Sequence, residues 1–507
     1  MAQILIKTER RQLRAESRDG QTLLDLLRQE GFRIAAPCGG QGKCGKCLVT
    51  VEDTAGERQV LACRIDASAA CTVSFREQGG GAILIAADTA SAAVTPGRAG
   101  LGAVVDLGTT TVVLELLDLS DGSSRGLRSA WNAQAPYGAD VITRIQYCMD
   151  HPEGLQTLQA AIRGQLRDML MELGCEPGDL KELFVAGNTV MQHLFAGLDA
   201  RSIALAPFTP QTLFAEDYTP EARLRYAPCV AGYVGGDITA GLLSSGLYAR
   251  PERSLFLDIG TNGEMALGGT EGFLCCAVAS GPAFEGAGIA CGMAGTDGAV
   301  SHVRWDGDAP ELEVIGGGTP RGLCGSGLID LLAALTQRRI ISAYGLLQGP
   351  DEVPESYARW LGEDENGNGI FYLTADRSVC LTAGDVRQLQ LAKAAVAAGI
   401  SVLLKKAGLR AEDLDRLYLA GGFGTYMDPK SAAAIGMLPA ALAEKTVLLG
   451  NASLAGARLA LLDETRRDTL REIRRSCRYL ELSGDPDFNR EYPEQMLFYE
   501  EDDEEWN

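Results

Sequence analysis

One segment of the chain occurs twice, and this repeat constrains the fold more than any other feature. AVVDLGTTTVVLELLDL (residues 103–119) matches SLFLDIGTNGEMALGG (residues 254–269). In each copy an apolar run of strand type leads into an Asp-x-Gly-Thr turn and then into a second strand. A second pair follows in the same order, ELFVAGNT (182–189) and RLYLAGGF (416–423). Segments duplicated in the same order predict two similar subdomains that face a common cleft.

The two copies differ in length, which locates an insertion. Asp106 and Gly187 are 81 residues apart in the first copy, whereas Asp258 and Gly421 are 163 residues apart in the second. The second copy therefore carries about 80 additional residues. We place this insertion within residues 300–380.

The chemistry of the Asp-x-Gly-Thr turns suits the phosphates of a nucleotide. Gly108 and Gly260 permit a tight turn and the close approach of a phosphate. Asp106 and Asp258 could hold Mg²⁺ through water or orient an attacking water. Glu264, just after the second turn, is a further candidate for this role, with a solvated strand residue as the alternative. Backbone N–H groups and polar side chains of the turns are the expected donors, at Thr109, Thr110, Thr261 and Asn262.

A Gly-rich turn after a predicted strand is the candidate for the adenosine site. Gly421, Gly422 and Phe423 would bring the backbone against a flat nucleoside. A single Gly-Thr turn is often a plain β-turn. Two copies, each followed by a strand and an Ala-Gly turn, favour nucleotide binding.

Four cysteines near the N-terminus form the second informative pattern. Cys38, Cys44, Cys47 and Cys63 have the spacing C-x5-C-x2-C-x15-C, within a glycine-rich loop and one later position. This pattern favours a [2Fe–2S] cluster, because such clusters take four thiolates and accept hydrogen bonds from backbone N–H groups. A structural zinc site and disulfides are the alternatives; zinc ribbons usually show two C-x-x-C pairs.

The segments around these cysteines predict a β-grasp ferredoxin domain. Leucines at helical spacing and alternating apolar residues give the order hairpin, helix, cluster loop and short strands. The expected strands and helix are 3–9, 11–17, 23–32 (helix), 48–53 and 71–77.

Length and charge limit the remaining possibilities. A chain of 507 residues exceeds one hydrophobic core, so we expect several domains. Its net charge of −21 argues against nucleic acid or an anionic membrane as the main partner. The chain has no apolar run of transmembrane length, which predicts a cytoplasmic protein. The expected divisions are a ferredoxin domain 1–78, a linker 79–100, subdomains 101–253 and 254–450, and a helical return with an acidic tail, 451–507.

Taken together, these segments resemble the ASKHA superfamily of ATPases and kinases, and more specifically the reductive activators of corrinoid proteins. The resemblance extends over nearly the whole chain. Further segments that carry it are 132–145, 187–198, 233–241, 279–293, 322–330, 385–400 and 420–429. It implies an α/β and α+β multidomain fold, with a β-grasp [2Fe–2S] domain followed by duplicated RNase H-like (actin-like) subdomains. ATP and Mg²⁺ would bind in the cleft.

The resemblance also implies an activity. Such proteins return an oxidised cobalamin from Co(II) to Co(I) by one-electron transfer, using ATP. The implied partners are a corrinoid protein of a methyltransferase system and a low-potential electron donor, with a homodimer left open. Longer members of the family carry a further domain where this chain has only residues 79–100.

Several residues have two interpretations from sequence alone. Ser280, in the loop ASGPAFEG, could face the corrinoid partner and offer an oxygen to cobalt, or the loop could simply line the nucleotide cleft. His193 is expected to be a packing residue, and Lys393 to lie on a solvated helix face. Alternative functions are a small-molecule kinase with a redox-sensing ferredoxin domain, and a non-enzymatic electron-transfer scaffold.

Overall fold

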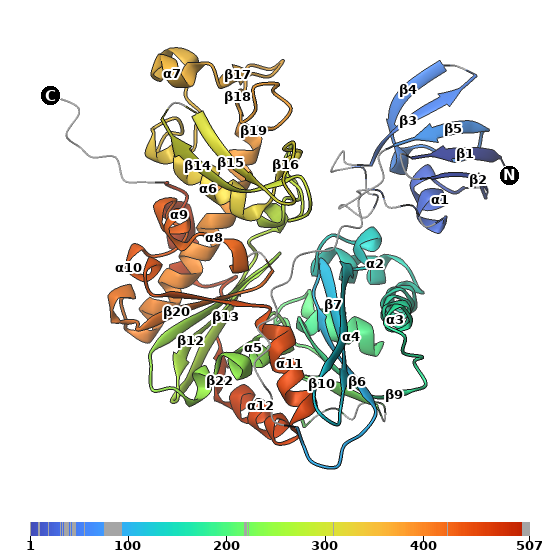
Figure 1. Cartoon of the computed structure of the whole chain (residues 1–507), viewed down its shortest axis with the longest axis vertical. Helices are drawn as coiled ribbons and strands as arrows, with labels where there is room; N and C mark the ends of the chain where they lie inside the picture. The colour runs from blue at the N-terminus through green and yellow to red at the C-terminus, as the bar shows by residue number, and fades with distance from the viewer. Residues whose placement is uncertain are drawn as a thin grey trace.

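The computed structural model shows three α/β units joined along one chain (Figure 1). It describes residues 2–8, 11–18, 20–30, 32, 34, 40, 42, 47–54, 56–75, 94–216, 218, 221, 223–307, 309–422 and 424–498. Cys38, Cys44 and Phe423, most of the predicted linker and the acidic tail from residue 499 lie outside the described residues.

The N-terminal unit is a mixed sheet with one helix, which confirms the predicted β-grasp arrangement. Its strands follow the order β2-β1-β5-β3-β4, with β1 and β5 parallel. The helix begins at a capping box in which Thr22 and Asp25 bond each other's backbone N–H. Its leucines are buried against the sheet. The sequence prediction missed β4, whose segment GERQVL is largely exposed. The bounds are β1 Gln3–Lys7, β2 Gln12–Glu16, α1 Leu23–Gln29, β3 Leu48–Asp53, β4 Gly56–Leu61, η1 Ala62–Arg64 and β5 Cys71–Ser74.

The second unit is built on the sheet β8-β7-β6-β9-β10. Strands β6, β7 and β8 are antiparallel, whereas β9 and β10 run parallel to β6. Its elements are β6 Leu101–Leu107, β7 Thr111–Asp118, β8 Ser124–Trp131, η2 Ala135–Tyr137, α2 Val141–Asp150, α3 Gly154–Glu172, β9 Leu180–Gly187, α4 Thr189–Ala196, η3 Arg201–Ile203, β10 Leu224–Tyr226, α5 Gly236–Ser245 and η4 Leu247–Ala249.

The third unit repeats this topology in the sheet β22-β13-β12-β11-β20-β21. The strand directions match those of the second unit, with β11, β12 and β13 antiparallel and β20 and β21 parallel to β11. Its elements are β11 Ser254–Ile259, β12 Gly263–Gly269, β13 Gly272–Val278, η5 Pro282–Glu285, α8 Ala383–Ala407, η7 Ala411–Asp413, β20 Arg416–Ala420, η8 Gly424–Tyr426, α9 Pro429–Ala434, α10 Ala440–Ala443, β21 Thr446–Gly450, α11 Ala452–Leu462, α12 Thr465–Ser476, β22 Cys477–Tyr479 and α13 Pro486–Glu494.

Two small sheets lie between the repeated strands of the third unit and extend away from its main sheet (Figure 1). One has the order β15-β14-β16 and the other β17-β18-β19. They occupy the region that the unequal spacing of the two copies indicated. The elements are β14 Ala299–Asp306, β15 Ala309–Val314, β16 Gly322–Leu323, α6 Gly325–Gln337, η6 Pro350–Glu352, α7 Glu355–Ala358, β17 Leu361–Glu363, β18 Gly369–Tyr372 and β19 Cys380–Thr382.

Helices α5 and α11 pack against each other between the two repeated sheets (Figure 1). Gly456 makes this approach possible, because a Cβ there would lie 1.9 Å from the carbonyl oxygen of Ala240. The surrounding core includes Ile238 and Phe256. A shared core of this kind fixes the starts of both helices relative to both sheets.

Lys393 corrects one expectation from the sequence. Its side chain is buried in α8, and its ammonium donates to the carbonyl oxygen of Leu497 and lies 5.2 Å from the ring centre of Phe498. Burial lowers its pKa to about 7. The residue was expected on a solvated helix face, but the C-terminal segment covers that face.

No helix in the described part of the chain combines the length and hydrophobicity that a membrane span requires.

Candidate functional site

The two Asp-x-Gly-Thr turns meet at a cavity of about 230 Å³ between the repeated sheets. The described residues that we predicted to bind nucleotide or Mg²⁺ all line this cavity. They are Asp106, Gly108, Thr109, Thr110, Asp258, Gly260, Thr261, Asn262, Glu264, Gly421 and Gly422. Their roles in catalysis and binding stay predictions.

The first turn is held from behind by two side chains. Asn132 donates its side-chain N–H to the carbonyl oxygen of Gly108 at 2.8 Å. Arg144, which is fully buried, donates to the carbonyl oxygen of Thr109 at 2.5 Å. Burial lowers the pKa of Arg144 to about 9, and the carboxylates of Asp140 and Glu285 oppose this shift. These contacts fix the turn that presents Thr109 and Thr110 to the cavity.

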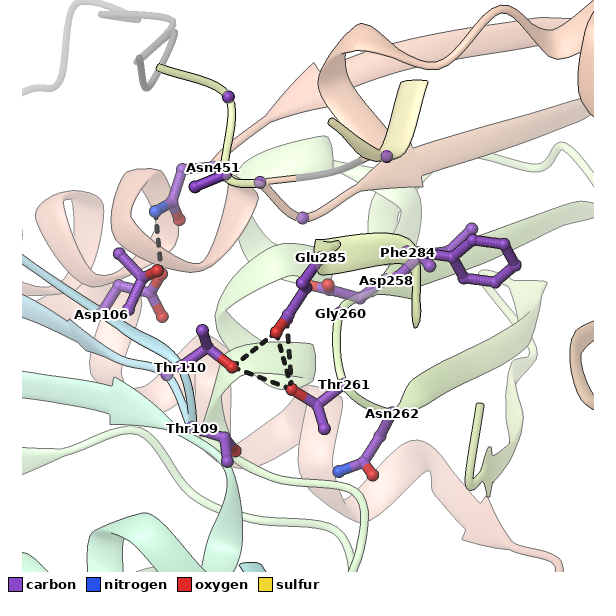
Figure 2. Close-up of a pocket in the computed structure, with 18 of the residues that line it drawn as sticks. Asp106, Thr109, Thr110, Asp258, Gly260, Thr261, Asn262, Phe284, Glu285 and Asn451 are labelled. Carbon is purple, nitrogen blue, oxygen red and sulfur yellow. Dashed lines mark hydrogen bonds between the residues drawn. The ribbon is translucent and has the colours of Figure 1, made fainter. Parts of the chain in front are cut away.

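The two turns touch through their threonines. The hydroxyl oxygens of Thr110 and Thr261 are 3.0 Å apart, and both bond the carboxylate of Glu285 (Figure 2). Gly421, in the turn that we predicted to contact adenosine, lies close to the second hairpin. Its φ is +93°, and a Cβ there would lie 2.6 Å from an Asp258 carboxylate oxygen. Gly422 has open space around its Cβ position.

Asp106 is tied to the start of α11. Asn451 caps this helix by accepting from the backbone N–H of Leu454, and its side-chain amide donates to Asp106 at 2.8 Å (Figure 2). Ser453 donates to the other carboxylate oxygen at 2.8 Å. Burial raises the pKa of Asp106, and these two hydrogen bonds oppose the shift. The aspartate is therefore held in one orientation by neutral donors.

Asp258 lies among other acidic groups. Burial raises its pKa to about 8, and the charges of Asp237 and Asp106 add to the shift. Asp237 stands in the first turn of α5, and burial followed by repulsion from Asp106 raises its pKa to about 7. The pKa of Glu264 is raised for the same reasons, by burial and by Asp237 and Asp258. Such a cluster is suited to a cation, which would relieve the repulsion.

These acidic residues fit Mg²⁺ together with nucleotide phosphates. Within the described residues, no three acidic, cysteine or histidine side chains converge closely enough to form a complete metal site. Mg²⁺ commonly keeps several waters and binds through one or two carboxylates plus phosphate oxygens. Asp258, Glu264 and Asp237 are the residues that would hold it here.

Several cavity residues were missed by sequence analysis. Asp237 and Asn188 lie within GGDITAG and GNTVMQ, segments noted earlier without an assigned role. A polar residue at the start of a helix that follows a strand is the signal that could have identified them. Asn451 and Ser453 stand at the start of α11 directly after β21 and carry the same signal. Glu285 carries no such local signal, because it reaches the cavity from a short turn and bonds residues of both hairpins.

Ser280 does not line the cavity. Its side chain is buried, and its hydroxyl donates to the carbonyl oxygen of Thr261 at 3.3 Å. His193 is a packing residue, as expected: its ring meets Phe214 edge to face and bonds the Thr189 carbonyl oxygen.

In the N-terminal unit, the described half of the cysteine pattern fits an iron–sulfur cluster. The sulfurs of Cys47 and Cys63 are 3.3 Å apart, and both side chains are buried. Gly40 lies beside Cys63 with a φ of +95°, and a Cβ there would be 3.8 Å from the Cβ of Cys63 and 3.2 Å from Leu24. Two adjacent sulfurs behind a glycine backbone make a cradle that a larger residue would fill.

The fold and these two sites define a class of protein: an ASKHA-type ATPase that carries its own [2Fe–2S] domain. Family models match in the same order, as the 2Fe-2S iron-sulfur cluster binding domain over residues 6–68, the RACo middle region over 101–250, and the C-terminal domain of RACo, the ASKHA domain, over 252–507. The chain belongs to the RACo family, the reductive activators of corrinoid proteins.

Individual relatives agree with this assignment. The chain is 29% identical to corrinoid activation enzyme RamQ of Eubacterium limosum, over 94% of this chain and 95% of the relative. It is 26% identical to the Co(II) methylated amine-specific corrinoid protein reductase of Methanosarcina barkeri, over 77% and 76%. A solved reductive activator for corrinoid, iron-sulfur protein superposes with a TM-score of 0.72 and 30% identity, over 98% of each chain. These relatives favour the activator interpretation over the kinase and scaffold alternatives.

Proposed function

We propose that this chain reductively activates a corrinoid protein in a reaction coupled to ATP binding and hydrolysis. A [2Fe–2S] cluster bound by Cys38, Cys44, Cys47 and Cys63 would supply one electron, which converts Co(II) of the partner to Co(I). The observation that carries the proposal is the union, in one chain, of a cluster-binding cradle and a duplicated nucleotide cleft with paired phosphate turns. The similarity to a solved reductive activator, over 98% of each chain, supports the proposal.

The need for ATP follows from the energetics of the electron transfer. Plant-type [2Fe–2S] centres have potentials near −400 mV, and the family resemblance implies a lower potential for Co(I) formation. A gap of roughly 150 mV for one electron corresponds to about 3.5 kcal/mol. Nucleotide binding could offset this cost by favouring one of two arrangements of the complex.

The residues of the cleft are suited to such coupling. Thr110 belongs to the first hairpin and Thr261 to the second, and their hydroxyls are in contact. A phosphate that bonds both hydroxyls would respond to the separation of the two subdomains, and Asp258 would hold the accompanying Mg²⁺. ATP would therefore act by setting the closure of the cleft rather than by phosphorylating a substrate.

We place the partner in a methyltransferase system, because a methyl-accepting corrinoid is the one that needs Co(I). Ser280 is a candidate for the contact with cobalt. Its burial against the second hairpin means that the 280–286 segment has to move before Ser280 can reach a partner.

The test is an anaerobic activation assay. The reduced full-length protein is mixed with a Co(II) corrinoid protein from the same organism, and the Co(I) absorption band is followed with and without MgATP. We expect Co(I) to form only with MgATP, and not with a Cys63→Ser variant. Equal formation without ATP, or none with any corrinoid protein of that organism, would reject the proposal.

A further inference from the structure

Glu285 bridges the two phosphate turns. Its carboxylate accepts a hydrogen bond from Thr110 at 2.6 Å and from Thr261 at 3.1 and 3.2 Å (Figure 2). The same carboxylate faces the backbone of the second turn, since a Cβ on Gly260 would lie 3.6 Å from one of its oxygens. One negatively charged side chain thus contacts both halves of the cleft at the residues expected to bind phosphate.

The two threonine hydroxyls cannot donate to Glu285 and to a phosphate at the same time. A threonine hydroxyl has a single proton to donate. When Thr110 and Thr261 donate to Glu285, they cannot donate to a phosphate oxygen. Carboxylates and phosphates are both oxyanions that take charge-assisted hydrogen bonds from such donors. A nucleotide phosphate that takes these hydroxyls must therefore displace Glu285.

The buried guanidinium of Arg144 favours an anion beside the two turns, whether it is the Glu285 carboxylate or a nucleotide phosphate. Arg144 supports the first turn from behind, and Glu285 is among the groups that oppose the lowering of its pKa. Burial in turn raises the pKa of Glu285, while Thr110, Thr261 and Arg144 oppose that shift. An incoming phosphate would bring at least as much negative charge to the same place.

The segment that carries Glu285 is a short turn bounded by two glycines, and Phe284 anchors its middle in the core. The turn η5 lies between Gly281 (φ +74°) and Gly286 (φ +78°), and glycine adopts such angles without the strain that other residues incur. A Cβ on Gly281 would meet no atom within 4 Å. Ser280, before the first glycine, is fastened to the second turn through the Thr261 carbonyl oxygen. Ser280 and Glu285, near the two ends of the segment, therefore both contact Thr261 of the second turn.

We propose that Glu285 is an internal anion that competes with a nucleotide phosphate for Thr110 and Thr261, and that its displacement releases the 280–286 segment. This inference rests on the proposed binding of ATP in the cleft. It gives that binding a mechanical consequence, because the released segment contains Ser280. Nucleotide occupancy would thus control whether the segment is available to a partner protein.

The experiment uses the full-length protein, its Glu285→Ala variant and a matched control, Glu271→Ala, an exposed glutamate in the turn between β12 and β13. The affinity for the magnesium complex of AMPPNP, a non-hydrolysable ATP analogue, is measured by calorimetry. We expect Glu285→Ala to bind at least about tenfold more tightly, because the competing charged hydrogen-bond acceptor is gone. Glu271→Ala should bind as the wild type does.

Hydrogen exchange of residues 280–290 supplies a second measurement that stands even if Glu285→Ala folds poorly. In the wild type, Mg-AMPPNP should speed exchange in this segment; in a Glu285→Gln variant, exchange should be fast before nucleotide is added. Unchanged or weaker nucleotide affinity of Glu285→Ala, or wild-type exchange that nucleotide does not alter, would overturn the inference. Loss of the proposed function would look different: none of the proteins, including the wild type, would bind AMPPNP.

Discussion

The two phosphate hairpins come from one duplicated pattern, yet their surroundings differ in chemistry. In both, the aspartate pairs with an alanine on the neighbouring parallel strand, Asp106 with Ala186 and Asp258 with Ala420. Across the hairpin the correspondence ends. Asp106 lies opposite Val113, whereas the second turn is one residue shorter and places Glu264 opposite Asp258.

The helix starts that face the two aspartates also differ: one presents neutral hydrogen-bond donors and the other presents a carboxylate. Each aspartate lies near the start of a helix from the other half: Asn451 and Ser453 of α11 bond Asp106, and Asp237 of α5 acts on Asp258. Neutral donors stabilise the charge of the first aspartate. Burial and, in addition, neighbouring carboxylates raise the pKa of the second.

The difference indicates how a duplicated fold can concentrate acidic groups at one of its two hairpins, where we predict the cation site. The backbone frame is the same in both halves, so the position of each aspartate is set by topology. Exchange of a valine for a glutamate, and of neutral helix-start residues for an aspartate, is enough to gather negative charge on one side. The first hairpin is accordingly predicted to orient a phosphate, and the second to hold Mg²⁺.

The most direct way to break the comparison is to neutralise each aspartate. Asp258→Asn should reduce ATP hydrolysis roughly 100-fold, because it removes a carboxylate predicted to hold Mg²⁺. Asp106→Asn should cost only about tenfold, since an amide oxygen can still accept from Asn451 or Ser453. Steady-state ATPase rates at saturating Mg²⁺ distinguish the two, and equal losses would show that the hairpins share one role.

The raised pKa values give a pH test of the same asymmetry. Metal binding must expel the protons of Asp258 and Asp237, whose pKa values are about 8 and 7. Affinity for Mg²⁺ in the presence of nucleotide should rise by up to about tenfold per pH unit between pH 7 and 8, where one proton is released, and more steeply below pH 7, where two are released. Titrations of Mg²⁺ at pH 6.5, 7.25 and 8 measure this slope, which Asp258→Asn should flatten.

Without Mg²⁺, the stability of the folded protein should fall as the pH rises, whereas the affinity for Mg²⁺ should increase. The folded protein keeps a proton on Asp258 that the unfolded chain releases, because burial raises the pKa from 3.8 to about 8. The resulting stabilisation is complete below about pH 4 and is lost as the pH rises to 8. Thermal unfolding in EDTA should show a melting temperature that falls over this interval, less steeply in Asp258→Asn; an identical fall in both proteins would contradict the assignment.

Alanine substitutions at the two turn glycines, Gly108 and Gly260, should affect stability and nucleotide binding differently. A Cβ on Gly108 would lie 2.5 Å from the carbonyl oxygen of Thr111, so Gly108→Ala should destabilise the protein by about 1–3 kcal/mol. Gly260→Ala meets only Glu285, at 3.6 Å, and should melt like the wild type. It should nevertheless bind nucleotide about tenfold more weakly, because the methyl group occupies the approach of a phosphate. Melting curves and AMPPNP titrations of both variants check this, and the reverse result would exchange the roles of the turns.

The smallest effect is expected at the helix start that faces Asp106. Ser453→Ala removes one of the two hydrogen bonds that the Asp106 carboxylate accepts, and this bond contributes about 0.5–1.5 kcal/mol. Nucleotide affinity should therefore fall only by a factor of about 2 to 12. Calorimetric titration measures it, with Ser244→Ala as a control, since Ser244 bonds Ala452 near the start of the same helix without contacting the cavity. A fall in affinity as large as that of Asp258→Asn in the same titration would mean that the first hairpin also carries the cation.

The hairpin turns and their strands could be predicted from local sequence patterns, whereas residues placed by long-range contacts could not. The Asp-x-Gly-Thr turns were identifiable because alternation and turn chemistry lie within a few residues of each other. Glu285 was missed because its partners, Thr110 and Thr261, belong to different halves and meet only after folding. Lys393 was misplaced for a related reason: a segment about 100 residues later covers it.

The crosswise contact of each hairpin with the other half's helix has a consequence for the history of the chain. Neither half holds a complete site by itself, since Asp106 needs α11 and Asp258 lies against α5. A single ancestral copy would have had to pair with a second copy to bring the same parts together. Severing the present chain between η4 and β11, so that α5 stays with the first half, should accordingly give two fragments that regain nucleotide binding only as a pair.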